Sequence, residues 1–540
     1  MSRLRFRLCA ALLFCVVFSP LSNRASADEP RRPNIVFVLA DDLGFSDLGC
    51  YGGEIETPEL DRLAKAGLQF TQFYNTARCW PTRGALLTGY YPQQIRRDRL
   101  DGIPSGNGGK RPAWAKLLPE RLRESGYRSY LSGKWHIDGS PLAGGFDRCY
   151  LLDDHDRFFG PKNHSEDGKP LPTPGPEDNY YATTAIAEHA IRCLRDHRAQ
   201  YGEQPFFSYV AFTAPHFPLQ AKAEDIARYR ERYLDGWDDL REQRWERMSG
   251  LGLKATSLSP IDRAQGPTYP QKDALAKLGP LELEFALPWS ELTPQVREFQ
   301  ATKMAVHAAM IDRMDREIGR IVAELRAMGE LERTMFVFLS DNGATAEMMV
   351  RGDGHDPQRP AGSAGTFLSL GPGWSALANT PFRKHKTWVH EGGISTPLIV
   401  HWPEGIKSQG EKRHTPGHVI DLVPTVLELA GLDAAAEKQD APPLAGKSLL
   451  SDFAGDGTAL HSSLWWEHEG NRAYREGDWK IVAAGKNNPW ELYDLSQDRT
   501  ELKDLAKAEP ERVSRMAAAW TARLDEFRKQ ASSDLEKKPE

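Results

Sequence analysis

Residues 34–42 read Asn-Ile-Val-Phe-Val-Leu-Ala-Asp-Asp, a continuous apolar run, rich in β-favouring side chains, that stops at two carboxylates. A strand with one face in water would alternate apolar and polar residues, and this run does not. Strands that are apolar throughout are typical of parallel sheets covered by helices on both faces. We therefore predict a central strand of an α/β domain, with Asp41 and Asp42 at its carboxyl end.

Three other segments repeat this pattern of an apolar strand followed by polar chemistry. They are residues 127–132, which lead to Lys134 and His136, residues 206–212, which lead to His216, and residues 335–340, which lead to Asp341 and Asn342. Ligands of open α/β sheets bind at the carboxyl ends of the strands, so we expect these side chains to share one site. Helical stretches at 60–67, 115–125, 181–197 and 302–328 separate the runs, as an α/β fold requires.

The C-terminal part of the chain has a different pattern. Short strand-like pieces at 464–466, 472–475, 479–482 and 491–494 precede a helical stretch over 510–529. We predict a smaller α+β subdomain over residues 441–540, with a small antiparallel sheet and one helix. A catalytic α/β domain would cover residues 28–440 and contain a large mixed, mostly parallel sheet flanked by helices, and residues 434–443 resemble a linker in composition.

Residues 1–27 have the pattern of a secretory signal peptide: three arginines, an apolar run over 8–18 and Ala25-Ser26-Ala27. That run is too short to span a bilayer, and no later run is long enough. We expect a secreted or periplasmic protein without a membrane span. The net charge of −6 makes nucleic acid a poor partner. Four cysteines follow the leader, too few for a disulfide scaffold.

One of these cysteines stands in a distinctive frame. Residues 79–83 read Cys-Trp-Pro-Thr-Arg and run into a short helical stretch that Gly89 can end. Pro81 suits the first turn of a helix, so Cys79 would lie at the positive N-terminal end, where anions are favoured. For the frame alone, a buried structural cysteine beside a turn proline is the more common interpretation.

Asp41, Asp42, Asp341 and Asn342 offer only hard oxygen ligands. Such ligands suit Ca²⁺ or Mg²⁺ and not Zn²⁺. Each pair taken alone is also a common turn or helix-cap sequence. The metal interpretation therefore depends on the pairs meeting in space.

These motifs together resemble the formylglycine-dependent sulfatase family, which is arylsulfatase-like and belongs to the alkaline-phosphatase-like superfamily. The resemblance covers residues 34–431 and rests on blocks in the family's order: Asp41-Asp42, the Cys79 frame, Gly133-Lys134-Trp135-His136, Pro215-His216, Ser340-Asp341-Asn342-Gly343, residues 381–386 with Glu391-Gly392-Gly393, and residues 418–431. The chain departs from the family at Trp80 and at Lys384-His385, where small residues are usual. We expect these departures to affect substrate fit more than chemistry.

The resemblance implies an alkaline-phosphatase-like fold and a sulfuric ester hydrolase in which a formylglycine-generating enzyme converts Cys79 to formylglycine. One hydroxyl of the hydrated aldehyde would attack sulfur. The metal, Ca²⁺ in preference to Mg²⁺, would be held by Asp41, Asp42, Cys79 as formylglycine, Asp341 and Asn342. Lys134, Lys386 and His216 would stabilise the sulfuryl oxygens, Arg83 would position the diol, and either His216 or Lys386 would protonate the departing alcohol. His136 would be the base that releases sulfate.

The substrate is expected to be a sulfate ester, with a sulfated carbohydrate as the candidate for an exported enzyme. Loops 153–178 and 344–374 would contact the alcohol part, with His355 and His385 at the rim. Two alternatives stay open. One is a phosphatase or phosphonate monoester hydrolase on the same fold, and the other is an inactive sulfate-binding homologue in which Cys79 stays unmodified.

Overall fold

The predicted central strand is β1 (Asn34–Ala40), and every residue in it is buried. It pairs in parallel with β7 (Phe206–Ala211) on one side and with β8 (Thr334–Ser340) on the other. β3 (Arg128–Gly133) pairs in parallel with β7, and β4 (Arg148–Leu152) pairs in parallel with β3. The four strands predicted from sequence are therefore confirmed as parallel neighbours, each within one residue of its predicted bounds.

The structure is a computed structural model that describes residues 31–535 apart from 254–256, 265–268, 270, 352–353, 434–440 and 456. The predicted signal peptide and most of the predicted linker lie outside these described residues. The domain boundary after residue 440 stays a prediction, since residues 33–540 form one unit. No helix in the described part is long and apolar enough to cross a bilayer.

The whole sheet is mixed, as predicted, with the strand order β10-β2-β9-β8-β1-β7-β3-β4-β5-β6 and β11 paired to β2. Antiparallel pairing joins β9 to β8 and to β2, and it joins β5 to β4 and to β6. The outer strands are β2 (Leu68–Tyr74), β5 (His164–Glu166), β6 (Lys169–Pro170), β9 (Ser395–His401), β10 (Glu411–Arg413) and β11 (Gly417–His418).

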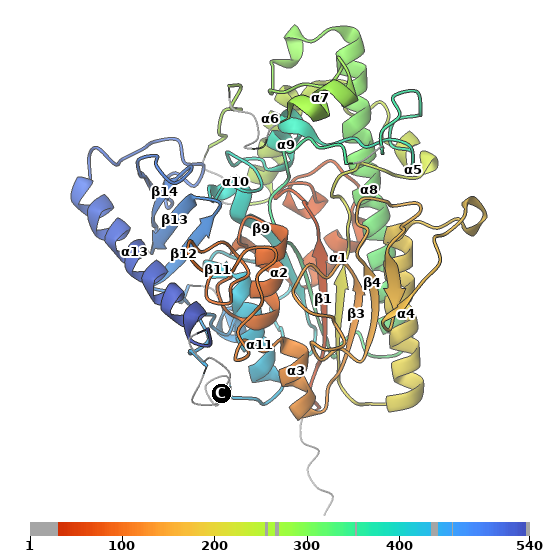
Figure 1. The fold of residues 1–540 in the computed structure, drawn as a ribbon, viewed down its shortest axis with the longest axis vertical. Helices are drawn as coiled ribbons and strands as arrows, with labels where there is room; N and C mark the ends of the chain where they lie inside the picture. Colours follow the sequence, from red (N-terminus) through yellow and green to blue (C-terminus); the bar gives the residue numbers. More distant parts are fainter. Residues whose placement is uncertain are drawn as a thin grey trace, which may run out of the picture. The chain divides into compact units, whose positions relative to one another are not determined.

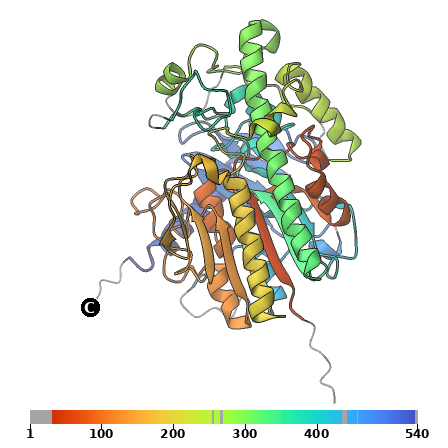
Figure 2. The same cartoon turned by 90° about the vertical axis from the view of Figure 1, so that its right-hand side faces the viewer.

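Helices cover both faces of this sheet (Figures 1 and 2). Val36 and Val38 of β1 pack into the core that contains the α4 and α8 side chains, and Figure 2 shows these two helices side by side. Ile35 and Phe37 point to the other face and pack with α2, α3 and α11. The helices are α1 (Pro58–Ala66), α2 (Cys79–Thr88), α3 (Leu118–Leu122), α4 (Ala182–Tyr201), α5 (Ala223–Ala227), α6 (Gly236–Gly250), α7 (Lys272–Leu278), α8 (Pro294–Ala327), α9 (Gly371–Ala378), α10 (Glu391–Ile394), α11 (Leu422–Leu429), α12 (Leu450–Ala454) and α13 (Pro510–Ser532).

Two helix predictions need correction. α8 begins at Pro294, well before predicted residue 302, and the Thr293 hydroxyl caps it by accepting from the Val296 N–H at 3.4 Å. Its first turns are mostly exposed and polar, so apolar periodicity could not reveal them. The helix predicted over 115–125 is shorter, because the backbone at Ala115 and Lys116 forms turns and α3 starts only at residue 118.

The predicted C-terminal subdomain is present as an antiparallel sheet with a helix beside it (Figure 1). Its strands are β12 (Ser463–His468), β13 (Asn471–Glu476), β14 (Trp479–Ala483) and β15 (Glu491–Asp494). Trp465 stacks on Trp520 of α13, with ring centroids 5.5 Å apart and the planes 14° apart. Trp465 also belongs to the core formed with α2 and α11, so the small sheet shares a hydrophobic core with the large one.

A buried ion network ties this C-terminal sheet to the rest of the protein. Lys480 Nζ of β14 lies 2.9 Å from Glu391 Oε1 and 2.8 Å from Glu501 Oε1, and all three side chains are buried. The backbone carbonyl of Glu501 accepts from Arg383 at 2.9 Å, and its carboxylate accepts from the Glu391 N–H at 3.0 Å. The C-terminal sheet and the loop after β15 therefore hold both ends of segment 383–391, which carries Lys386.

Candidate active site

Cys79 is the first residue of α2, as predicted, and Pro81 lies in its first turn. Gly89 ends the helix with a φ of 78°, in the left-handed region that glycine enters without strain. The side chain of Cys79 is only 3% exposed, and burial raises the pKa of its thiol. Residue 79 thus lies at the positive end of a helix, in a site nearly closed to water.

Each of the two aspartates after β1 forms an ion pair with a lysine. Lys134, which follows β3, places Nζ 2.5 Å from Asp41 Oδ2, and Lys386 places Nζ 2.7 Å from Asp42 Oδ1. Asp42 has a φ of 66°, in the left-handed region that few residues other than glycine adopt. Burial raises the pKa of the Cys79 thiol, and both lysines act in the opposite direction.

Lys386 is held by backbone contacts from several parts of the chain. Its N–H donates to the Ala344 carbonyl at 3.1 Å, and the N–H of Thr387 donates to the Ala77 carbonyl at 2.9 Å. Lys384 and Thr387 have φ values of 68° and 86°, conformations that persist only when their surroundings impose them. Burial alone would lower the pKa of Lys386, but Asp42 and Glu347 raise it, so this lysine is charged.

The two ligands predicted after β8 contact Arg83 and Asp42. Arg83, the last residue of the Cys79 frame, donates to Asp341 Oδ2 from Nε at 3.0 Å and from Nη2 at 2.7 Å. Arg83 also donates to the carbonyl of Lys134 at 3.0 Å. Asn342 Nδ2 donates to Asp42 Oδ1 at 2.6 Å. Arg83 therefore links the helix that carries Cys79 to the ends of two strands.

The crowded carboxylates have opposite tendencies to ionise. Burial raises the pKa of Asp341 to about 7, and the nearby Asp41 carboxylate contributes to the rise. Burial also opposes ionisation of Asp41, but Lys134, His216 and Arg83 lower its pKa well below the usual range. Asp41 is therefore an anion, while Asp341 binds a proton easily when no further cation is near.

Three oxygens in this cluster are buried and have no hydrogen-bond partner: Asp41 Oδ1, Asp42 Oδ2 and Asn342 Oδ1. Unpaired buried acceptors are costly, so native proteins normally satisfy them with a donor, water or an ion. Carboxylate and amide oxygens are the ligands that Ca²⁺ and Mg²⁺ prefer. The residues present therefore fit the metal that the resemblance implies.

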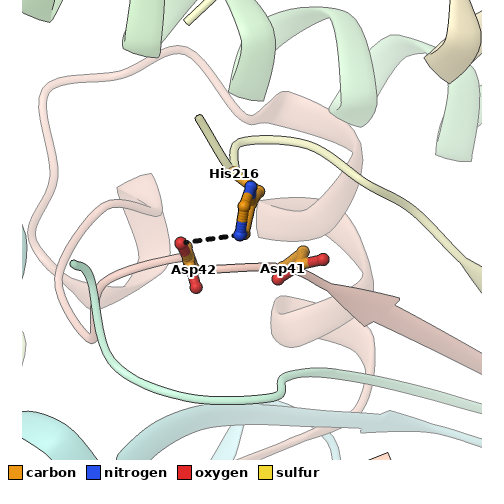
Figure 3. Close-up of side chains that lie close together, drawn as sticks. All are labelled: Asp41, Asp42 and His216. Carbon is orange, nitrogen blue, oxygen red and sulfur yellow. Dashed lines mark ion pairs between the residues drawn. The ribbon is translucent and has the colours of Figure 1, made fainter. Parts of the chain in front are cut away.

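His216 is a second neighbour of these aspartates (Figure 3). Ligand atoms of Asp41, Asp42 and His216 lie within 4.8 Å of one another, with His216 Nε2 3.8 Å from Asp42 Oδ2. An imidazole nitrogen is a preferred ligand of transition metals and not of Ca²⁺. Because the three unpaired atoms are oxygens, they suit the predicted metal better than the His216 ring does. The metal-ligand roles of Asp41, Asp42, Asp341 and Asn342 and the proton-transfer role of His216 stay predictions.

Three imidazoles surround this cluster. The His155 ring centroid lies 5.9 Å from that of His136 and 5.4 Å from that of His216. Burial lowers the pKa of all three histidines well below the usual range, and Lys134 contributes in each case. Neutral imidazoles can accept a proton, and the buried His136 Nδ1 has no partner. These rings can therefore supply a base for ester hydrolysis.

Sequence reasoning did not identify His155. It follows β4, whose carboxyl end lies at the same sheet edge as that of β3, so the pattern of a strand followed by polar residues could have revealed it. Its neighbour Asp156 accepts from Arg351 at 2.6 Å, which joins the two loops predicted to contact substrate. The rim prediction for His385 is wrong, because this ring is buried and its Nδ1 lies 2.7 Å from Ser375 Oγ.

The structure therefore gathers the predicted side chains at one sheet edge, mostly through direct contacts. They are Asp41, Asp42, Cys79, Arg83, Lys134, His136, His216, Asp341, Asn342 and Lys386. Their arrangement puts cations and imidazoles around residue 79 and around a set of unpaired oxygens. Such a site can bind a tetrahedral oxyanion and stabilise charge that develops on it.

Comparisons with known proteins agree with this site. The sulfatase family model matches residues 33–432, and a model for the C-terminal part of N-sulphoglucosamine sulphohydrolase matches residues 382–530. An uncharacterized sulfatase of Schizosaccharomyces pombe is 33% identical over 91% of this chain and 93% of its own length. An arylsulfatase of Klebsiella aerogenes is 32% identical over 79% of this chain and 94% of its own length.

The fold is also that of solved relatives. The structure of Ps i-CgsB in complex with k-i-k-neocarrahexaose superposes with a TM-score of 0.65 at 24% identity, over 93% of this chain and 94% of that one. The family model covers most of the chain, and two relatives exceed 30% identity. The chain therefore belongs to the sulfatase family of the alkaline-phosphatase-like superfamily and is a sulfuric ester hydrolase.

Proposed function

We propose that this sulfatase is exported, uses Ca²⁺ and a formylglycine made from Cys79, and removes sulfate from sulfated carbohydrates. The observation that carries the metal proposal is the set of unpaired buried oxygens on Asp41, Asp42 and Asn342. The formylglycine proposal is supported by the place of Cys79, at the N-terminus of α2 and within the electrostatic influence of Lys134 and Lys386.

The aldehyde hydrate would supply a nucleophilic hydroxyl and Ca²⁺ would supply positive charge beside it. The chain's own residues do the rest. Lys134 and Lys386 place fixed positive charge beside the aspartates that follow β1, where the sulfuryl oxygens gain negative charge during attack. Burial keeps these charges poorly screened by water, so they act strongly on the ester.

Three residues can move protons. His216 Nδ1 donates to the Phe217 carbonyl, which leaves Nε2 facing Asp42. A proton taken up on Nε2 would be the one passed to a departing alcohol. Lys386 is the alternative donor. His136 is neutral, and its unpaired buried Nδ1 suits a base that accepts a proton during sulfate release.

The carbohydrate proposal is supported by a relative in complex with a carrahexaose and by a matching C-terminal model from a sulfohydrolase of a sulfated amino sugar. Export is supported by the arginine-led apolar stretch and small residues within positions 1–27. An exported enzyme meets sulfated polysaccharides, which do not cross membranes.

The experiment is to produce the protein with and without a formylglycine-generating enzyme and to measure the mass of the peptide that contains residue 79. We expect activity on an aryl sulfate and on sulfated oligosaccharides only in the preparation in which sulfur is replaced by oxygen with loss of two hydrogens. Cys79→Ala is the matched inactive control. Full activity with unmodified Cys79 would overturn the proposal, and faster turnover of phosphate or phosphonate esters would support the phosphatase alternative.

A further inference from the structure

A cavity of about 890 Å³ adjoins the reaction centre on the side of the C-terminal sheet. Its walls come from loop 98–107, the turn between β12 and β13, and α13. Pockets for small ligands typically have volumes of about 300 to 1,000 Å³. Trp80, the residue next to Cys79, lines this cavity, so the cavity begins where the catalytic helix begins.

Trp80 connects the cavity to the catalytic histidines. Its ring centroid lies 5.7 Å from that of His136 and 5.6 Å from that of His468 on β12. The Arg78 guanidinium carbon lies 5.1 Å from the same ring, and the Trp80 side chain is partly exposed. A wide aromatic surface is therefore fixed between the base proposed for sulfate release and the C-terminal sheet.

Three buried nitrogens at this cavity have no hydrogen-bond partner: Trp80 Nε1, His468 Nε2 and Arg472 Nε. Trp80 and Arg472 line the cavity, and His468 contacts Trp80. His468 Nδ1 lies 2.8 Å from Asp98 Oδ2, and although burial opposes it, Asp98 raises the pKa of His468. The Trp80 and Arg472 nitrogens can only donate, so this wall needs a ligand that accepts hydrogen bonds.

The cavity also has acceptors and a second aromatic side chain. Glu467, Glu469 and Trp520 lie in its wall. Sugar rings combine apolar C–H faces, which pack on aromatic rings, with hydroxyls that both donate and accept hydrogen bonds. This mixture of indole surface, unpaired donors and carboxylates matches a saccharide better than it matches an apolar alcohol.

We propose that this cavity binds the sugar residue that neighbours the sulfated one, with Trp80 and Arg472 as specificity-determining residues. The inference rests on the proposed function and specifies which surface binds the alcohol part of the substrate. It also explains why a bulky residue stands at position 80, directly after Cys79: a small residue there would leave the cavity without its wall beside His136.

A second cavity provides the matched control. It has a volume of about 750 Å³ and is lined by Arg157, Lys222 and Arg351, among others. The ion pair between Asp156 and Arg351 lies at its edge, and Arg157 pairs with Asp154 at 2.8 Å. Arg157→Leu therefore removes a cavity-lining arginine, as Arg472→Leu does, but from loop 153–178, the loop that the sequence predicts to contact the alcohol part. The two variants therefore distinguish these two surfaces.

The experiment measures competition against aryl sulfate hydrolysis by the formylglycine-containing enzyme. The competitors are sulfated hexasaccharides prepared from carrageenan, chondroitin sulfate and heparin. At least one should inhibit the wild type, and Arg472→Leu should weaken that inhibition about tenfold or more while leaving aryl sulfate turnover unchanged. Trp80→Ala should weaken inhibition by the same hexasaccharide to a similar extent, and Arg157→Leu should leave that inhibition unchanged. Formylglycine content and melting temperature are measured for each variant.

Failure of the inference is distinguishable from failure of the proposed function. If the wild type does not hydrolyse aryl sulfate, the proposed function fails. If aryl sulfate is hydrolysed but no hexasaccharide inhibits the reaction, the cavity is not a sugar subsite. The same conclusion follows if a hexasaccharide inhibits Arg472→Leu and Trp80→Ala as strongly as it inhibits the wild type. Equal weakening by Arg157→Leu would also overturn the assignment. Should Arg472→Leu fail to fold, Trp80→Ala and Arg157→Leu still decide the question.

Discussion

Replacing Lys480 by methionine should destabilise the protein strongly, although residue 480 lies outside the reaction centre. The side chain is fully buried and pairs with two carboxylates, Glu391 at 2.9 Å and Glu501 at 2.8 Å. Methionine keeps a similar length but leaves both carboxylates without that charge. Breaking a buried ion pair by removing one partner costs about 3–5 kcal/mol. Arg499 lies 3.2 Å from Glu391 and partly compensates for the lost charge. We therefore expect the free energy of unfolding to fall by about 3 kcal/mol.

The assay is urea unfolding followed by tryptophan fluorescence, which is sensitive here because five of the tryptophans lie in the C-terminal subdomain: Trp465, Trp466, Trp479, Trp490 and Trp520. Lys486→Met is the matched control, since its pair with Asp101 is exposed and such pairs contribute at most about 1 kcal/mol. Adding Glu391→Gln to Lys480→Met should recover part of the loss, because one uncompensated charge disappears.

Activity should fall together with stability in Lys480→Met. The network holds the ends of segment 383–391, and Lys386 on that segment contacts Asp42. A loosened segment would let the Lys386 ammonium move away from the site, so turnover should drop even under conditions in which the protein is folded. An unfolding midpoint equal to that of Lys486→Met would refute the assignment of this network as the tie between the C-terminal sheet and the active site.

Three further outcomes are expected. Cys79→Ser should release at most one alcohol per active site in a rapid-mix assay and retain sulfate on the serine, and sustained turnover would contradict the need for two hydroxyls. Saturating Ca²⁺, at 100 times its Kd, should add about 2.7 kcal/mol of stability, and Asp42→Asn should abolish most of that gain in thermal melts with and without chelator. Burial opposes ionisation of Glu391, but Lys480 and Arg499 lower its pKa to about 2, below the ordinary 4.5. Its stabilisation is therefore complete above pH 4.5 and lost as the pH falls toward 2. Between pH 6 and pH 3 the wild type should lose more stability than Glu391→Gln, and equal losses would argue against this carboxylate.

The four central strands and the helical place of Cys79 were predictable because their determinants are local. An apolar run such as 34–40 must be buried on both faces, and Pro81 with Gly89 marks both ends of a short helix. The polar residues that follow the strands could be grouped for the same reason, since parallel strands present their carboxyl ends at one edge.

Local pattern did not reveal other parts of the site. The start of α8 is polar and exposed, so it lacks the apolar periodicity on which the prediction depended. His155 was missed because its strand, β4, has only five residues and begins with Arg148, so it lacks the long apolar run of the central strands. His385 was predicted to lie at the rim because charged segments that contain histidine are usually exposed. In the structure its ring packs against Ser375 and is buried.

The sequence by itself determined the α/β class, the identity of the residues that end each central strand, and the family. These depend on side-chain type and on spacing along the chain, which no distant contact alters. Only the tertiary structure decided which donors and acceptors remain unpaired, that Arg83 binds Asp341, and that the C-terminal sheet holds the segment of Lys386. It also decided that Trp80 faces a cavity shared with β12, β13 and α13. Such facts depend on contacts between residues hundreds of positions apart, because burial and pairing are properties of the packed whole.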